Sequence, residues 1–83
     1  MADQEIAKVV HYYDKIMVAL LKLSGELAVG DKVKFVYHDK EFSQTVDSME
    51  IEHQKIGSAR SGEEVAIKLN EATHENAQVY KMG

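Results

Sequence analysis

Short runs of alternating apolar and polar residues, broken by turn-forming residues about every 8–12 positions, limit what this chain can fold into. Such runs occupy residues 32–37, 42–46, 65–69 and 78–81. They are rich in β-branched and aromatic side chains, which favour strands with one buried face. The polar segments 38–41 and 71–77 are expected to form a hairpin turn and a loop. The pattern therefore predicts an all-β fold.

The side-chain parity changes after the second run of the pattern. Phe42 and Val46 occupy even positions, whereas Met49 and Ile51 occupy odd positions. One extra residue in a strand changes which face its side chains occupy. We therefore expect a β-bulge near Asp47-Ser48.

The first third of the chain fits two structures. Apolar residues between Val9 and Leu21 fall at spacings that a helix would also satisfy. The β-branched and aromatic stretch 9–13, followed by a plausible turn at Asp14-Lys15, favours a hairpin instead. Pattern alone leaves both alternatives open.

Several short strands in a chain of 83 residues, 45% of them apolar, predict one small domain spanning residues 1–83. A barrel or a sandwich would suit these strands. Closing the sheet is physically attractive because an open sheet exposes two unpaired edges, and the chain has no proline to blunt an edge.

Composition argues against several classes of protein. The net charge is −4 with no cluster of lysine and arginine, so DNA binding is not expected. No apolar run is long enough to cross a membrane, and the acidic first residues do not resemble a signal peptide. The chain has no cysteine, so it has no disulfide and no thiolate metal site. We expect a cytoplasmic location.

Metal and cofactor sites are not expected either. The four histidines, at positions 11, 38, 53 and 74, are too far apart in sequence for the spacing of a zinc motif. There is no phosphate-binding G-x-x-x-x-G-K-[ST] motif, so GTP binding and hydrolysis are not expected.

Several segments resemble a known family. Residues 27–33 (LAVGDKV), 46–51 (VDSMEI) and 62–69 (GEEVAIKL) resemble the second domain of translational GTPases such as elongation factor Tu. Residues 8–16 and 42–53 are similar to the small stand-alone proteins called translation elongation factor-like proteins. A related barrel follows the catalytic part of certain collagenase-like peptidases.

The resemblance implies a closed six-stranded antiparallel β-barrel of the translation-protein type, covering about residues 6–82. It also implies two strands in the ambiguous first third. Asn76 stands in the last turn, where the family usually has Gly-Asp, and asparagine tolerates a left-handed turn. Met17 and Ala66 stand where the family often has glycine, and we expect changes in packing there.

The same resemblance indicates a site. It places Glu50 where elongation factor Tu has a glutamate beside the terminal adenosine of aminoacyl-tRNA. Glu52, His53, Lys55 and Arg60 would extend this into a partner-binding or RNA-binding rim. The alternative is that all five are ordinary solvated side chains, with the lysines and arginine balancing nearby acids. Paired carboxylates at 50 and 52 would need a cleft to act in catalysis, which a small filled barrel rarely offers.

The sequence therefore predicts a non-enzymatic binding module without catalytic residues. The favoured partner is the ribosome, tRNA or a translation-factor protein. The alternative is an accessory barrel for a separate enzyme such as a collagenase-like peptidase. A small hydrolase or metal protein is a third and weaker class.

Overall fold

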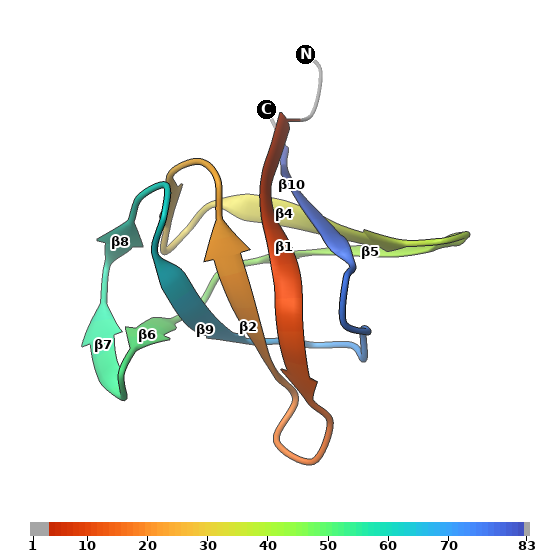
Figure 1. The fold of residues 1–83 in the computed structure, drawn as a ribbon, viewed down its shortest axis with the longest axis horizontal. Helices are drawn as coiled ribbons and strands as arrows, with labels where there is room; N and C mark the ends of the chain where they lie inside the picture. The colour runs from red at the N-terminus through yellow and green to blue at the C-terminus, as the bar shows by residue number, and fades with distance from the viewer. Residues whose placement is uncertain (1–3, 83) are drawn as a thin grey trace.

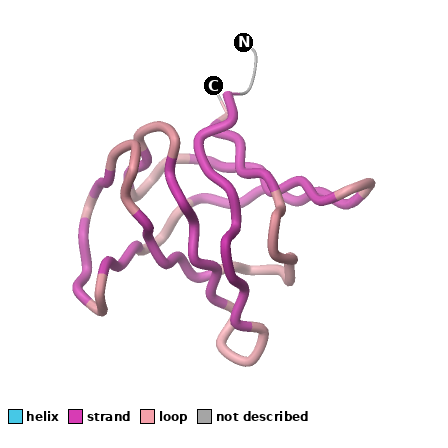
Figure 2. Tube along the Cα trace, in the orientation of Figure 1, coloured by secondary structure: helices cyan, strands magenta, loops and turns pink. Residues whose placement is uncertain are grey.

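A computed structural model describes residues 4–82, and every regular element in this part of the chain is a β-strand. The strands are β1 (Gln4–Tyr13), β2 (Val18–Leu23), β3 (Leu27–Ala28), β4 (Lys32–Tyr37), β5 (Lys40–Thr45), β6 (Met49–Ile51), β7 (Gln54–Ile56), β8 (Ser58–Ala59), β9 (Glu64–Lys68) and β10 (Gln78–Lys81). Figure 2 shows the loops that separate them. The all-β prediction is confirmed. Among the described residues there is no helix long and apolar enough to span a membrane.

Eight strands form one antiparallel sheet in the order β5-β4-β10-β1-β2-β9-β6-β7, and β3 pairs with β8 separately. Figure 1 shows β4 and β5 crossing behind β1 at a steep angle, so the sheet is strongly twisted. In the described chain β5 and β7 are edges that do not pair with each other. The prediction of a closed six-stranded barrel is therefore wrong. Residues 4–82 form ten strands, most of them short, and the sheet stays open.

The core lies on the concave side of this sheet. Its fully buried side chains come from nearly every strand, and the largest are Phe35, Leu21, Leu27, Met49 and Ile67. Phe42 stacks on Phe35 with ring centroids 5.0 Å apart. Burial of alternate residues in β2, β4 and β9 follows the period-two pattern of the sequence.

The buried side chain of Gln44 connects the β5 edge to the far half of the sheet. Its Nε2 donates to the Lys68 carbonyl at 2.9 Å, and its Oε1 accepts from the Asn70 amide at 2.8 Å. Gln44 is only 5% exposed. One side chain thus satisfies two backbone groups where no strand ladder forms between β5 and β9.

The change of parity after Val46 has a different cause from the one expected. β5 ends at Thr45 and β6 begins at Met49, so residues 46–48 are a crossing segment and not a bulge within a strand. The Val46 amide donates to the Asp31 carbonyl, and the Gly30 amide donates to the Val46 carbonyl. The expected β-bulge near Asp47-Ser48 is therefore wrong. The register shifts in the sheet occur in β1 instead, between Glu5 and Ala7 and between Val9 and His11.

The first third of the chain forms the β1–β2 hairpin, as the resemblance implied, and the helical alternative is wrong. Met17, in the connecting turn, has a φ of 56°, a left-handed conformation that favours glycine. The Tyr12 hydroxyl donates to the Met17 sulfur at 3.1 Å, and the Leu69 amide donates to the Met17 carbonyl. Backbone conformation, and not only packing, therefore distinguishes this position.

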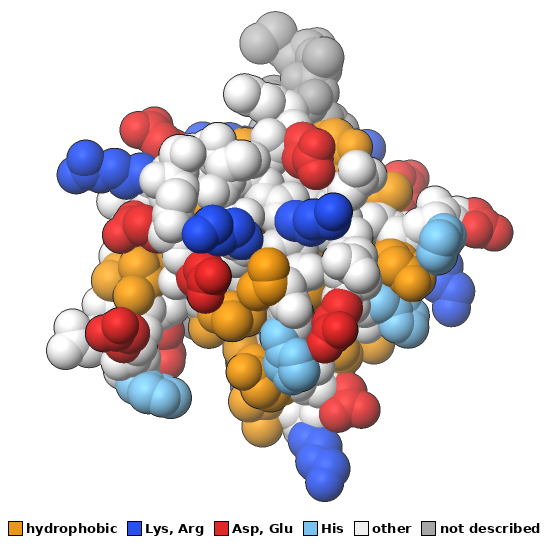
Figure 3. All heavy atoms as spheres, viewed as in Figure 1, with side chains coloured by type: hydrophobic (Ala, Val, Ile, Leu, Met, Phe, Trp, Pro, Cys, Tyr) orange, Lys and Arg blue, Asp and Glu red, His pale blue; other side chains and the backbone are white. Residues whose placement is uncertain are grey.

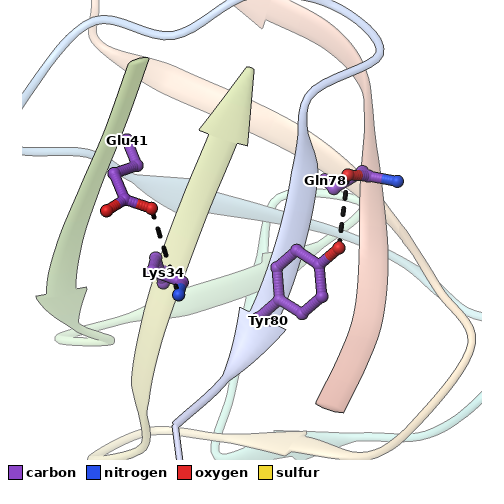
Figure 4. A network of polar contacts seen from close by, with 4 residues as sticks. All are labelled: Lys34, Glu41, Gln78 and Tyr80. Carbon is purple, nitrogen blue, oxygen red and sulfur yellow. Dashed lines mark hydrogen bonds and ion pairs between the residues drawn. The ribbon is translucent and has the colours of Figure 1, made fainter. Parts of the chain in front are cut away.

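The outer surface of β4, β5 and β10 carries a polar cross-strand network (Figure 4). Lys34 Nζ lies 4.0 Å from the Glu41 carboxylate and 5.8 Å from the centre of the Tyr80 ring. The Tyr80 hydroxyl donates to Gln78 at 3.3 Å. Contacts of this kind on a solvated surface contribute little stability, about 0–1 kcal/mol each.

The Gln44 bridge leads to a prediction about stability. Gln44→Met keeps the side-chain length but leaves the Lys68 carbonyl and the Asn70 amide without their partner. We expect the free energy of unfolding to fall by about 2–4 kcal/mol. Urea denaturation measures this change. Gln54→Met, at an exposed position of β7, is the matched control and should change it by less than about 0.5 kcal/mol. Equal effects of the two substitutions would contradict the role of the bridge.

The turn before β10 gives a second prediction. Asn76 has a φ of 73°, as its residue type suggested. We expect Asn76→Ala to lower the free energy of unfolding by about 1 kcal/mol and Asn76→Gly to preserve it. Asn70→Ala, which removes an exposed asparagine from a position without positive φ, is the control. If Ala and Gly at position 76 behave alike in thermal denaturation, the backbone explanation fails.

Candidate functional site

A hollow of about 440 Å³ lies on the outer side of the sheet, between the β1–β2 hairpin and the β6–β7 hairpin. Its lining consists of Tyr13, Ile16, Val18, Leu20, Glu50, Glu52, His53, Glu64 and Ala66. Three of these, Glu50, Glu52 and His53, are residues that the sequence singled out. We call this site the acidic hollow.

Strand alternation produces the apolar floor of the acidic hollow. In β2 the side chains of Ala19 and Leu21 enter the core, which leaves Val18 and Leu20 on the outer face. In β9 Ala66 also faces outward, and it pairs with Leu20 on one side and Glu50 on the other. Because alanine is small, it leaves room above the floor between these longer neighbours.

Exposed hydrophobic surface concentrates here. Ile16 is 59% exposed and Tyr13 is 45% exposed, and both line the hollow. In Figure 3 hydrophobic side chains gather toward the lower end of β1 and β2, with acidic side chains on either side. The most exposed large hydrophobic side chain of the described residues thus belongs to this site. Exposed apolar surface rimmed by polar groups is typical of interaction sites.

The rim of the hollow is acidic. Glu50 comes from β6, Glu52 from the β6–β7 turn and Glu64 from the start of β9. Between residues 4 and 82, none of these three carboxylates makes an ion pair or a hydrogen bond. The described lining includes no lysine or arginine. The site therefore presents negative charge around an apolar floor.

The turn that carries part of this rim has an unfavourable backbone. Glu52 and His53 have φ values of 51° and 67°, and they join Ile51 to its partner Gln54. Two consecutive left-handed residues are the geometry of a type I′ turn, for which Asn-Gly is the preferred sequence. A left-handed conformation costs other residue types about 1–2 kcal/mol each. Strain of this kind clusters at functional sites.

The five residues that the sequence predicted as a rim do not form one surface. Glu50, Glu52 and His53 lie together in the hollow, and Lys55 is exposed on β7 opposite Glu50. Arg60 lines a separate depression with Asp31 and Lys81. The sequence reasoning did not find Tyr13, Ile16 or Glu64 as site residues. The available signal was Ile16, because a large apolar side chain within a turn is expected to stay exposed to solvent.

The other histidines do not join this site. His11 Nδ1 lies 2.8 Å from the Glu75 carboxylate, and His74 lies beside the Tyr37 ring, with centroids 4.7 Å apart. Over the described part of the chain, no group of three or more potential ligands could hold a metal ion.

Three comparisons place this structure among known proteins. No protein-family model matches the sequence. A protein of Methanocaldococcus jannaschii, named an uncharacterized protease, is 35% identical over 77 residues, which cover 92% of this chain. The chain spans only 19% of the length of that relative.

Solved structures agree on the fold. The C-terminal domain of a proposed U32 peptidase from Geobacillus thermoleovorans superposes with a TM-score of 0.90, covering 96% of this chain and 93% of that domain. This chain has the fold of that domain. A selenomethionine variant of the same domain gives a TM-score of 0.86, covering 92% of this chain and 96% of that one. Both are 18% identical in sequence to this chain.

These matches correct the resemblance drawn from short motifs. The proteins found are one named an uncharacterized protease and, by fold, the C-terminal domain of a proposed U32 peptidase, and not elongation factors or translation elongation factor-like proteins. The expectations of ribosome, tRNA or RNA binding therefore lose their basis. The motifs at 27–33 and 62–69 lie in turns and strands of the fold. They therefore reflect the local backbone geometry and do not indicate a function in translation. The acidic hollow also does not suit a phosphate backbone.

The strained turn generates a third prediction. Replacing Glu52 by Asn and His53 by Gly should raise the free energy of unfolding by about 1 kcal/mol, because these residues accept a type I′ turn. The control makes Asp14→Asn and Lys15→Gly in the β1–β2 turn, where neither residue has a positive φ. That pair should leave stability unchanged or lower it. A loss of stability in the β6–β7 turn variant, measured by urea denaturation, would contradict the strain.

Proposed function

We propose that this chain is a non-catalytic accessory domain that works with a U32-type peptidase catalytic part and binds polypeptide for it. The observation that carries the proposal is the 35% identity to a protein named as a protease, over nearly all of this chain. The fold shared with a U32 peptidase C-terminal domain supports it. This is the accessory role that the sequence offered as the alternative. We also propose the cytoplasm as its location.

The form of the site supports binding over catalysis. Glu52 and Glu64 are exposed and Glu50 is half-buried, so the carboxylates of the hollow remain open to water. A general acid or base needs an enclosed environment that shifts its proton affinity. An apolar floor with unpaired charge at its rim is instead suited to recognising a side chain and its neighbours.

A domain exchange tests the proposed function. The matched 77 residues of the Methanocaldococcus protein would be deleted in one variant and replaced by the corresponding residues of this chain in another. The measurement is the affinity for unfolded lysozyme, reduced and alkylated, by fluorescence anisotropy. We expect the deletion to weaken binding about tenfold, or about 1.4 kcal/mol, and the exchange to restore it.

Two results would contradict the proposal. An exchanged protein that is folded but binds as weakly as the deletion variant would show that this chain does not supply the accessory role. Cleavage of labelled unfolded lysozyme by the 83-residue chain alone would show that the domain is itself catalytic.

A further inference from the structure

The acidic hollow has a lining specific enough to indicate what it binds. We propose that it takes a linear segment of unfolded polypeptide in which one large apolar side chain stands next to lysine or arginine. Such segments would belong to the polypeptide substrate of the peptidase-type partner. The inference rests on the proposed function for the identity of that substrate, and it adds the side-chain chemistry that the domain selects.

The apolar side chain of the segment is inferred from the floor. Val18, Leu20 and Ala66 form the floor, and the exposed Ile16 and Tyr13 stand at one wall. A bound side chain would cover apolar surface that is now in water, at about 25 cal/mol per Å². Tyrosine is also a frequent anchor in binding sites.

The basic neighbours of that side chain are inferred from the rim. Glu50, Glu52 and Glu64 approach the hollow from three different elements, and in the described chain each lacks an ion-pair or hydrogen-bond partner. Lys55 lies opposite Glu50 on the adjacent strand, and Lys22 lies opposite Glu64, but both are outside the lining. Cationic groups on either side of the apolar anchor would meet these carboxylates.

The size of the site favours a short segment over a permanently docked domain. Stable protein–protein interfaces bury about 1,200–2,000 Å² in total. The hollow is lined by nine residues, far fewer than the roughly 20–30 residues that each partner contributes to such an interface. A segment that binds briefly and leaves needs no larger area, as a substrate requires.

The charge also disfavours a second copy of this chain as the occupant. The chain has a net charge of −4. In a two-fold symmetric contact through this site, the three glutamates of one copy would face those of the other. Like charges brought together in this way oppose association.

The experiment uses the 83-residue chain labelled with ¹⁵N and three synthetic nonapeptides in nuclear magnetic resonance titrations. The first peptide has a central phenylalanine with two lysines on each side and glycine elsewhere. The second replaces the lysines by glutamates, and the third replaces the phenylalanine by alanine. We expect saturable shifts of the Ile16, Glu50, Glu52 and Ala66 amides with the first peptide only. Its affinity should fall several-fold between about 0.05 and 0.5 M salt.

Substitutions on the surface test the two parts of the lining separately. Ile16→Ser removes the exposed wall, and Glu50→Gln combined with Glu64→Gln removes two charges. Each should weaken binding of the first peptide by about fivefold or more. Val29→Ser and Glu71→Gln are the controls, since Val29 is 43% exposed and both residues lie outside the hollow. The controls should bind as the unaltered chain does.

Three outcomes would overturn the inference: no binding of the first peptide, equal binding of the first and second peptides, or shifts that map away from the hollow. Concentration-dependent shifts at the hollow without peptide would identify a second copy as the occupant instead. These results are separate from the domain exchange. If the exchange restores binding of unfolded polypeptide but the peptides do not bind at the hollow, the accessory function stands and only the recognition chemistry is wrong.

Discussion

The two hydrogen bonds of the Gln44 side chain hold together a sheet that its backbone ladders leave open. The ladder runs from β5 around to β7, and each of these edge strands pairs on one side only among the described residues. Gln44 donates to the carbonyl of Lys68, the last residue of β9, and accepts from the amide of Asn70 just beyond that strand. A buried amide without such partners would cost about 1–3 kcal/mol, so its full satisfaction explains why a polar residue is tolerated in the core. The bridge lets a small sheet curl around a core without closing.

The sequence predicted the strand content well because alternation is a local property. Val33 and Phe35, or Val65 and Ile67, enter the core wherever the strand is placed, so their pattern requires no knowledge of the fold. Closure could not be predicted in the same way. It depends on which strands meet at the edges, and there a side chain, Gln44, replaces a ladder. The parity change after Val46 illustrates the same limit, because a bulge and a crossing segment both shift the apolar residues from even to odd positions.

The sequence predicted only those residues of the site that lie close together in the chain. Glu50, Glu52 and His53 share one hairpin, and the sequence therefore grouped them. Glu64 and Ile16 join them through the pairing of β9 with β6 and through the fold of the β1–β2 turn, which are tertiary features. Arg60 is close to His53 in sequence, but β8 carries the chain to the partner strand β3 and away from the hollow. Short motifs also indicated the wrong family, since turns and strands of one geometry recur in unrelated functions.

The two walls of the acidic hollow differ in how firmly the fold holds them. β2 and β9 form five residue pairs, whereas β6 joins β9 through only two, Met49 with Ile67 and Glu50 with Ala66. Met49 is buried and fixes the β6–β7 hairpin to the core, and the Val29 amide donates to the Gly57 carbonyl just beyond that hairpin. The strained turn at Glu52 and His53 therefore stands at the end of a hairpin that joins the rest of the sheet through two residue pairs. These two pairs set how closely the β6–β7 hairpin approaches β9, and they therefore set the width of the hollow. In the proposed recognition, an apolar side chain would lie over the floor formed by β2 and β9, while the carboxylates of the rim would favour positive charge beside it.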